Sequence, residues 1–293
     1  MPSLLYRVRP AAVLDVAGPD REAFLQGQLT QDVRRASAGG RALEAAGLSP
    51  KGKIVFVARL IAAGDALRLV MPPGLRETVA AHLKKYAVFQ KVTLEDRTED
   101  FVRVGVHGEA PPPSDGELEL GPDGEFDADR LVPGALREGF LGALGARGGR
   151  PLGEEEAEVL RVEAGRPRFG RDFDASNLPD EAGLQDAISS TKGCYVGQEV
   201  VARLRTYGRV NRRIVGFRFP DGPVAAGSQL ERPGAGPGDR AAPGRVTSSV
   251  VSDRFGAIGL GWAFHDLPVG GELVSQDTPP RRAVVAQLPF AAA

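Results

Sequence analysis

Short apolar runs joined by turn residues, with helical segments between them, are the feature that most limits how this chain can fold. Residues 54–61 and 67–71 are apolar runs separated by Ala63-Gly64-Asp65, which predicts a β-hairpin. Apolar residues recur at helical spacing over 20–36 and 75–86, so a helix is expected in each segment. Hairpin pairing without a regular strand–helix–strand repeat is typical of the α+β class.

Strands and helices are expected to continue beyond residue 90, and the last 80 or so residues differ from the rest. Further strands are expected over 91–95 and 101–106, and helices at about 134–145 and 153–163. Near the C-terminus, a stretch rich in Gly and Pro lies among three short apolar runs. These are residues 214–219, 246–251 and 257–262. Several short strands with turn signals between them predict a small all-β unit.

Composition narrows the class of protein. A chain of 293 residues corresponds to about two domains, and its 42% hydrophobic residues are enough for a substantial core. The 37 Lys and Arg nearly balance the 38 Asp and Glu, which argues against a dedicated nucleic-acid binder. No apolar run approaches the roughly 18 residues that cross a bilayer, and residues 1–9 lack the long apolar region of a signal peptide. We therefore expect a cytoplasmic protein with neither a nucleic-acid nor a membrane partner.

The single cysteine, Cys194, is the most informative residue. It cannot form an intramolecular disulfide or build a cysteine-cluster metal site, so no metal site is expected. Glycines flank it, a helix is expected to begin near Gly197, and Lys192, Arg203 and Arg205 are close in sequence, which would favour a thiolate. The alternative is a small buried apolar residue, since free cysteines are usually buried.

The segment Lys192-Gly-Cys-Tyr-Val-Gly-Gln-Glu199 resembles the signature octapeptide of the YgfZ-type folate-binding proteins. These relatives of the glycine-cleavage T-protein (aminomethyltransferase) support the assembly or repair of iron–sulfur clusters. Five further segments fall in the family's order, so that the resemblance covers most of the chain: residues 24–32, 48–53, 85–86, 161–167 and 244–248.

The resemblance implies a T-protein-like α+β fold, with two α+β regions of antiparallel sheets around a central opening and a C-terminal β-barrel. We expect a first α+β region over 1–110, a second over 111–212 that carries the octapeptide, and a small barrel over 213–293.

The resemblance also implies that tetrahydrofolate or a derivative binds in the opening. Glu163 matches a glutamate that binds the pterin in T-proteins, and a carboxylate can accept hydrogen bonds from the pterin's amino group and ring N–H. Without the resemblance, Glu163 would be interpreted as a surface residue of a helix. The other candidate folate contacts are Lys192, Tyr195, Arg203, Arg205 and Arg209. Of these, the arginines would pair with the carboxylate tail of the folate.

The chain departs from the T-protein enzymes at one essential position. T-proteins carry an acidic residue in a hairpin that corresponds to residues 51–58, where this chain has Ile54, Val55, Phe56 and Val57. The nearest acid, Asp65, lies in the turn beyond that strand. Without the carboxylate, proton transfer at the substrate amine has no evident agent, so ordinary aminomethyltransferase activity is not expected.

The resulting hypothesis is a folate-binding accessory protein for iron–sulfur enzymes, with Cys194 as its central, catalytic residue. The thiol would act as a transient ligand for a cluster or sulfur, or as a redox-sensitive group. One cysteine cannot hold a cluster alone, so an iron–sulfur protein or assembly factor would complete the ligand set. The alternatives are a folate-dependent aminomethyl or one-carbon transferase, and a folate sensor or scaffold without chemistry.

Overall fold

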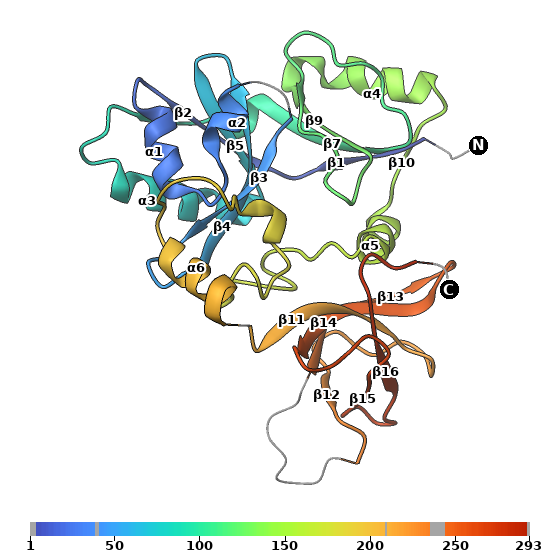
Figure 1. Ribbon diagram of the computed structural model, residues 1–293. Coiled ribbons are helices and arrows are strands. Elements are labelled where there is room, and N and C mark those ends of the chain that lie inside the picture. Colours follow the sequence, from blue (N-terminus) through green and yellow to red (C-terminus); the bar gives the residue numbers. More distant parts are fainter. Residues whose placement is uncertain (1–3, 39–40, 209, 235–243, 292–293) are drawn as a thin grey trace. The chain divides into compact units, whose positions relative to one another are not determined.

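The computed structural model describes residues 4–38, 41–208, 210–234 and 244–291, which form two compact units (Figure 1). Unit 1 contains Met1–Gly153 and Leu184–Ala202, and unit 2 contains Glu154–Gly183 and Arg203–Ala293. Each unit is therefore assembled from two separate stretches of chain. The three-region division at 110/111 and 212/213 stays a prediction.

The first sheet of unit 1 is antiparallel, with strand order β3-β4-β5-β2-β6. Its strands are β2 (Ala12–Ala17), β3 (Leu43–Leu48), β4 (Ile54–Ala63), β5 (Ala66–Met71) and β6 (Thr93–Asp96). The β4–β5 pairing confirms the predicted hairpin, which turns at Gly64 with φ of +63°. Helices α1 (Arg21–Gln28), α2 (Val33–Ser37) and α3 (Arg76–Tyr86) belong to the same part of the chain.

The helix expected over 20–36 is wrong in its middle, because the structure divides it into α1 and α2. Leu29 is extended, with φ −107° and ψ 151°, and Thr30 bonds to β3 instead of continuing the helix. The backbone N–H of Thr30 donates to the Ala46 carbonyl (2.9 Å), and the Ala46 N–H donates to Thr30 Oγ1 (2.9 Å). Asp32 then caps α2 by accepting from the Arg34 N–H. Tertiary bonding has overridden the helical periodicity.

The second sheet of unit 1 has strand order β10-β1-β7-β9-β8, and only its β1–β10 pair is parallel. The strands are β1 (Leu5–Arg9), β7 (Phe101–His107), β8 (Leu118–Glu119), β9 (Ala128–Pro133) and β10 (Arg150–Pro151). Helix α4 (Arg137–Ala146) packs Phe140 and Leu144 against Val104 and Val132 of this sheet. Short 3₁₀ turns lie at Pro73–Leu75, Thr98–Asp100, Gly134–Leu136 and Gln185–Ala187.

Unit 2 contains a closed barrel with strand order β11-β14-β13-β12-β15-β16, which confirms the predicted C-terminal β-barrel. Its strands are β11 (Arg212–Arg218), β12 (Gln229–Glu231), β13 (Gly244–Ser252), β14 (Gly256–Phe264), β15 (Glu272–Ser275) and β16 (Arg282–Ala286). Helix α5 (Glu154–Glu163) packs on β13 and β14. Helix α6 (Gln198–Tyr207) begins in unit 1 and ends in unit 2.

The described residues contain neither a membrane-spanning helix nor a cluster of metal-ligating side chains. None of their helices is long and apolar enough to cross a membrane. Over the same residues, no group of three or more His, Cys, Asp or Glu side chains is arranged to hold a metal ion.

Candidate functional site

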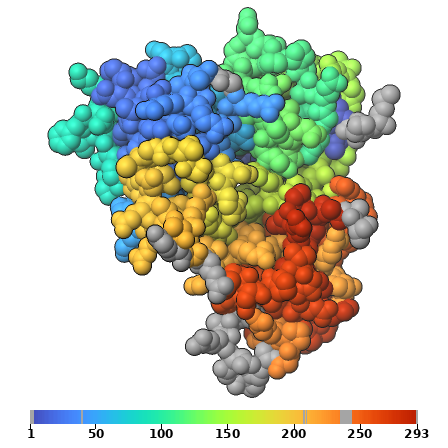
Figure 2. Space-filling model, in the orientation of Figure 1, coloured from blue at the N-terminus to red at the C-terminus, as the bar shows by residue number. Residues whose placement is uncertain are grey.

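Cys194 lies in the cysteine loop, residues 184–197, which is bonded to the rest of unit 1 along its length. Thr30 Oγ1 donates to the Ala187 carbonyl (2.6 Å), and the Ser189 N–H donates to the Thr30 carbonyl (3.0 Å). Further along, the Val196 N–H donates to the carbonyl of Gly27 in α1 (3.0 Å). The space-filling view shows this yellow segment at the surface, against the blue residues of unit 1 (Figure 2).

Lys192 attaches the cysteine loop to the end of α1. Its side chain is buried, and Nζ donates to the carbonyls of Gln26 (2.7 Å), Leu29 (2.6 Å) and Gln31 (3.0 Å). These three acceptors use every donor of an ammonium group, and they lie at the negative end of the helix dipole. Burial lowers the pKa of Lys192 to about 8, against a smaller raising effect of the Asp32 carboxylate. Lys192 therefore has a structural role that its position beside Cys194 did not reveal.

Two glycines allow the octapeptide and the segment 48–53 to interlock. Gly197 has φ of +83°, and a Cβ there would lie 2.5 Å from the Ser49 carbonyl oxygen. A Cβ on Gly52, at φ +72°, would lie 2.8 Å from Cβ of Val200 in α6. Only glycine adopts these backbone angles and leaves this space. Two segments that carry the family resemblance are thus in direct contact.

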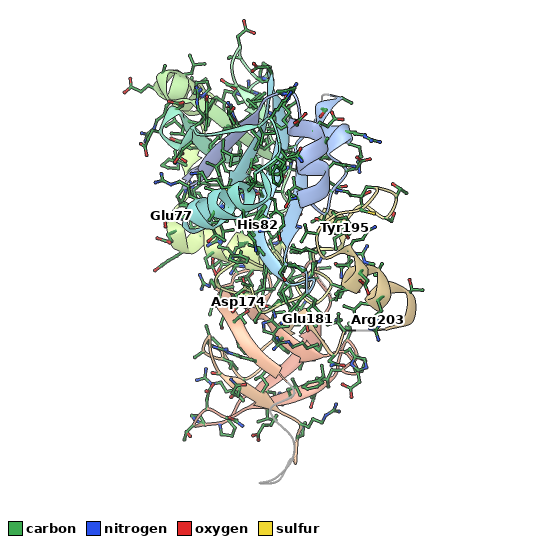
Figure 3. The ribbon with its side chains drawn as sticks, turned by 90° about the vertical axis from the view of Figure 1, so that its left-hand side faces the viewer. Glu77, His82, Asp174, Glu181, Tyr195 and Arg203 are labelled. Atoms are coloured by element: carbon green, nitrogen blue, oxygen red, sulfur yellow. The ribbon has the colours of Figure 1, made fainter. Side chains whose placement is uncertain are left out.

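The thiol itself is exposed, which does not fit the alternative of a small buried apolar residue. Its neighbour Tyr195 (Figure 3) is buried, with its ring 5.1 Å from Lys192 Nζ. The loop therefore buries Lys192 and Tyr195 and leaves Cys194, which lies between them, exposed.

Glu163, the last residue of α5, is buried in unit 2 and is not a surface helix residue. Its Oε1 accepts from Ser252 Oγ (2.5 Å) and its Oε2 from the Arg254 guanidinium (3.1 Å). Both partners lie where β13 turns into β14, and nothing in the sequence had singled out Arg254. Since each carboxylate oxygen can accept about two hydrogen bonds, the group retains capacity for two more.

A second buried carboxylate, Asp172, connects two further segments of the resemblance. Its oxygens accept from Arg161 (2.8 Å), Thr247 Oγ1 (2.6 Å), Ser248 Oγ (2.7 Å) and the Arg168 N–H (2.8 Å). Arg161 and Asp172 are both nearly inaccessible to solvent. The segments 161–167 and 244–248 are thus held together within unit 2.

The remaining candidates are dispersed. Arg205 pairs with Asp180 (3.0 Å), Arg203 is exposed on α6, and Arg209 lies outside the described residues. Cys194, Lys192 and Tyr195 belong to unit 1, whereas Glu163, Arg203 and Arg205 belong to unit 2. Lys192 and Tyr195 contact each other beside the thiol, but Glu163 pairs with Arg254 and with neither candidate arginine.

The strand that should carry the T-protein acid is apolar, as the sequence indicates. Ile54, Phe56 and Ala58 of β4 are buried, and Val55 and Val57 alternate with them on the other face. Asp65 lies in the β4–β5 turn, beyond the segment in question.

Known proteins resemble this chain in sequence and in fold. No family model matches the chain. An uncharacterized protein of Haemophilus influenzae is 34% identical over 228 residues, which are 75% of this chain and 75% of that protein. The tRNA-modifying protein YgfZ of Yersinia pestis (strain Pestoides F) is 32% identical over 253 residues, 79% of this chain and 76% of the relative.

The fold is that of a glycine-cleavage T-protein. The aminomethyltransferase T of Bartonella henselae matches with a TM-score of 0.86 over 99% of this chain and 86% of that one, at 20% identity. That similarity confirms the T-protein-like α+β fold, and the sequence relatives identify the family among the proteins with this fold. The chain belongs to the YgfZ family.

Proposed function

We propose that this protein binds a reduced folate, tetrahydrofolate or a derivative, and supports the assembly or repair of iron–sulfur enzymes through the thiol of Cys194. The observation that carries the proposal is an exposed cysteine in a loop that is held to unit 1 by two buried residues close to it, Lys192 and Tyr195. A thiol fixed in this way is accessible to a partner protein. The family membership and the T-protein-like fold support the folate part.

Glu163 is the residue best suited to bind the pterin. Its carboxylate has unused acceptor positions, and the side chain of Arg254 that pairs with it is 69% exposed, so that contact can be exchanged at small cost. Lys192, Tyr195, Arg203 and Arg205 are weaker candidates, because Lys192 is fully bonded to carbonyls and Arg205 is paired with Asp180.

The thiol supplies one ligand or one reactive sulfur. An iron–sulfur cluster needs several such ligands, so a client enzyme or an assembly factor has to provide the others. The relatives' name supports a link to tRNA modification. A net charge of −1 favours action through a protein partner over direct binding of tRNA.

An aminomethyl transferase is the less suitable function for this chain. The segment 51–58 has no carboxylate, and Asp65 lies in the turn that follows the strand. Proton transfer at a substrate amine needs a group within hydrogen-bond reach, and β4 offers only apolar side chains at the corresponding positions.

Calorimetric titration with tetrahydrofolate tests the folate part. The wild-type protein should bind, and Glu163→Gln should weaken binding by about 10-fold or more, because hydrogen bonds to charged groups contribute about 1.5–3 kcal/mol. Glu155→Gln, an exposed acid in the same helix, is the matched control and should bind like the wild type. No heat of binding with the wild type, or equal affinity of Glu163→Gln, would contradict the proposal. A thermal melt of each variant separates lost binding from lost folding.

A further inference from the structure

Unit 2 contains a pocket of about 750 Å³ whose residues all belong to that unit. Strands β13 and β14 form one wall, and the segment 170–177 forms another. The hydrogen bonds that the buried Asp172 carboxylate accepts from Thr247 and Ser248 hold that segment against β13. Asp174, which belongs to this segment and lines the pocket, is labelled in Figure 3.

The pocket wall that β13 and β14 form is the outer face of the barrel. Val246 and Ala263 point into the barrel core, so their neighbours Arg245 and Trp262 point outward. Arg245 and Trp262 are opposite each other in the β13–β14 register, and both line the pocket. The indole Nε1 of Trp262 donates to the Asp172 carbonyl (2.9 Å), which fixes the ring in place.

A cationic, planar surface lies beside the indole. The guanidinium of Arg212 is 4.9 Å from the centre of the Trp262 ring, and its ion pair with Glu181 is long, at 3.6 Å. A guanidinium stacked on an aromatic ring can still donate from its edge and can stack a further planar group on its free side.

The pocket also holds hydrogen-bond donors that have no partner among the described residues. Asn177 is 4% exposed, and its Oδ1 accepts from the Asp174 N–H (2.9 Å). Its Nδ2 has no hydrogen-bond acceptor among the residues that the structure describes. Within the same residues, Arg245 forms no ion pair. Nδ2 of Asn177 is not one of the buried polar atoms without a partner, so it is open to the pocket and can donate to a ligand that supplies acceptors.

The acids in the pocket do not cancel this character. Asp172 is consumed by Arg161, Thr247 and Ser248, and Asp174 accepts from the Ser176 N–H (2.7 Å). Asp174 keeps acceptor positions of its own, but its charge lies near that of Arg212, so the donors left for a ligand beside the aromatic wall are Arg245 and Nδ2 of Asn177.

We propose that this pocket binds a small organic anion that carries a planar ring. The ring would pack on the Trp262–Arg212 stack, and the anionic group would accept hydrogen bonds from Arg245 and from Nδ2 of Asn177. A cation would meet two guanidinium groups, and a neutral aromatic molecule would leave the donors unsatisfied. The inference requires neither the thiol of Cys194 nor a folate at Glu163.

Trp262 is the only tryptophan of the chain, so its indole N–H gives a single NMR resonance that reports on this pocket. The probes are benzoate, its neutral relative benzamide, the cation benzylamine and inorganic phosphate, all at equal ionic strength. Benzoate should shift the indole resonance saturably, benzylamine should not, and benzamide and phosphate should each bind at least several-fold more weakly than benzoate.

Arg245→Gln should weaken benzoate binding about 10-fold or more, because it removes the charged donor that faces the anionic group. The matched control is Arg232→Gln, because Arg232 is an exposed arginine of unit 2 that pairs with Asp266 outside the pocket. No saturable shift with benzoate, equal binding of benzamide or phosphate, or wild-type affinity in Arg245→Gln would overturn the proposal.

Discussion

Replacing Lys192 by methionine tests whether the cysteine loop is held as the structure indicates. Methionine has nearly the length of lysine and no charge, so Lys192→Met removes the ammonium without leaving a large void. The carbonyls of Gln26, Leu29 and Gln31 then lose a donor that lies 2.6–3.0 Å away. Because the side chain of Lys192 is 8% exposed, water cannot easily replace it.

The expected loss follows from two opposing effects. Leaving a buried polar group unsatisfied costs about 1–3 kcal/mol for each group. Removing the buried charge offsets part of this loss of stability, because desolvation already disfavours the ammonium and lowers the pKa of Lys192 to about 8. With three carbonyls affected, we expect the free energy of unfolding of unit 1 to fall by about 2–4 kcal/mol.

Urea unfolding measures that loss, and Lys84→Met is the matched control because Lys84 is exposed on α3. An exposed substitution should stay within about 0.5 kcal/mol of the wild type. Hydrogen exchange gives a local readout, since the amide of Val196, bonded to Gly27, should exchange faster in Lys192→Met. If Lys192→Met were as stable as Lys84→Met and Val196 kept its protection, the reasoning about the loop would be refuted.

Two further predictions concern buried ionisable groups. Asp172→Ala should destabilise unit 2 by about 3–5 kcal/mol, because it leaves the buried Arg161 guanidinium without this counter-charge, and a thermal melt against the exposed-site control Asp253→Ala measures the difference. Burial, and then the charge of Lys85, lower the pKa of His82, so the unfolded chain binds more protons below about pH 6.5 and stability should fall as the pH drops from 7.5 to 5.5. Urea titrations at those two pH values should show a smaller fall in His82→Leu, and an equal fall would contradict the assignment.

Local patterns were sufficient to predict some of the regular elements, whereas strands such as β1, β2, β3 and β9 were not predicted. The β4–β5 hairpin, α3 and the main barrel strands follow from apolar periodicity and turn residues within each segment. Strand β12 was not predicted, because its three residues lie in a stretch dominated by Gly and Pro and are fixed by pairing with β13 and β15. The break between α1 and α2 was missed because it depends on Ala46, which belongs to another element.

At the candidate site, too, the sequence predicted the residues but not their contacts with distant parts of the chain. The sequence identified Cys194, Lys192 and Glu163 through a family motif, and the motif does not specify which atoms they contact. That Lys192 bonds to the end of α1 depends on a contact about 160 residues distant in the chain. Nothing in the sequence indicated that Arg254 pairs with Glu163, because an arginine in a turn is ordinarily a solvated residue.

The most direct test of the central claim is the activity of iron–sulfur enzymes in cells that lack this protein. Cells are supplied with the wild type or with Cys194→Ser, which keeps the size of the side chain and removes the sulfur. Purified Cys194→Ser should fold and bind tetrahydrofolate like the wild type, because the side chain of Cys194 is exposed. We expect the wild type to restore the enzyme activities and Cys194→Ser to fail. Full restoration by Cys194→Ser would contradict the role assigned to the thiol.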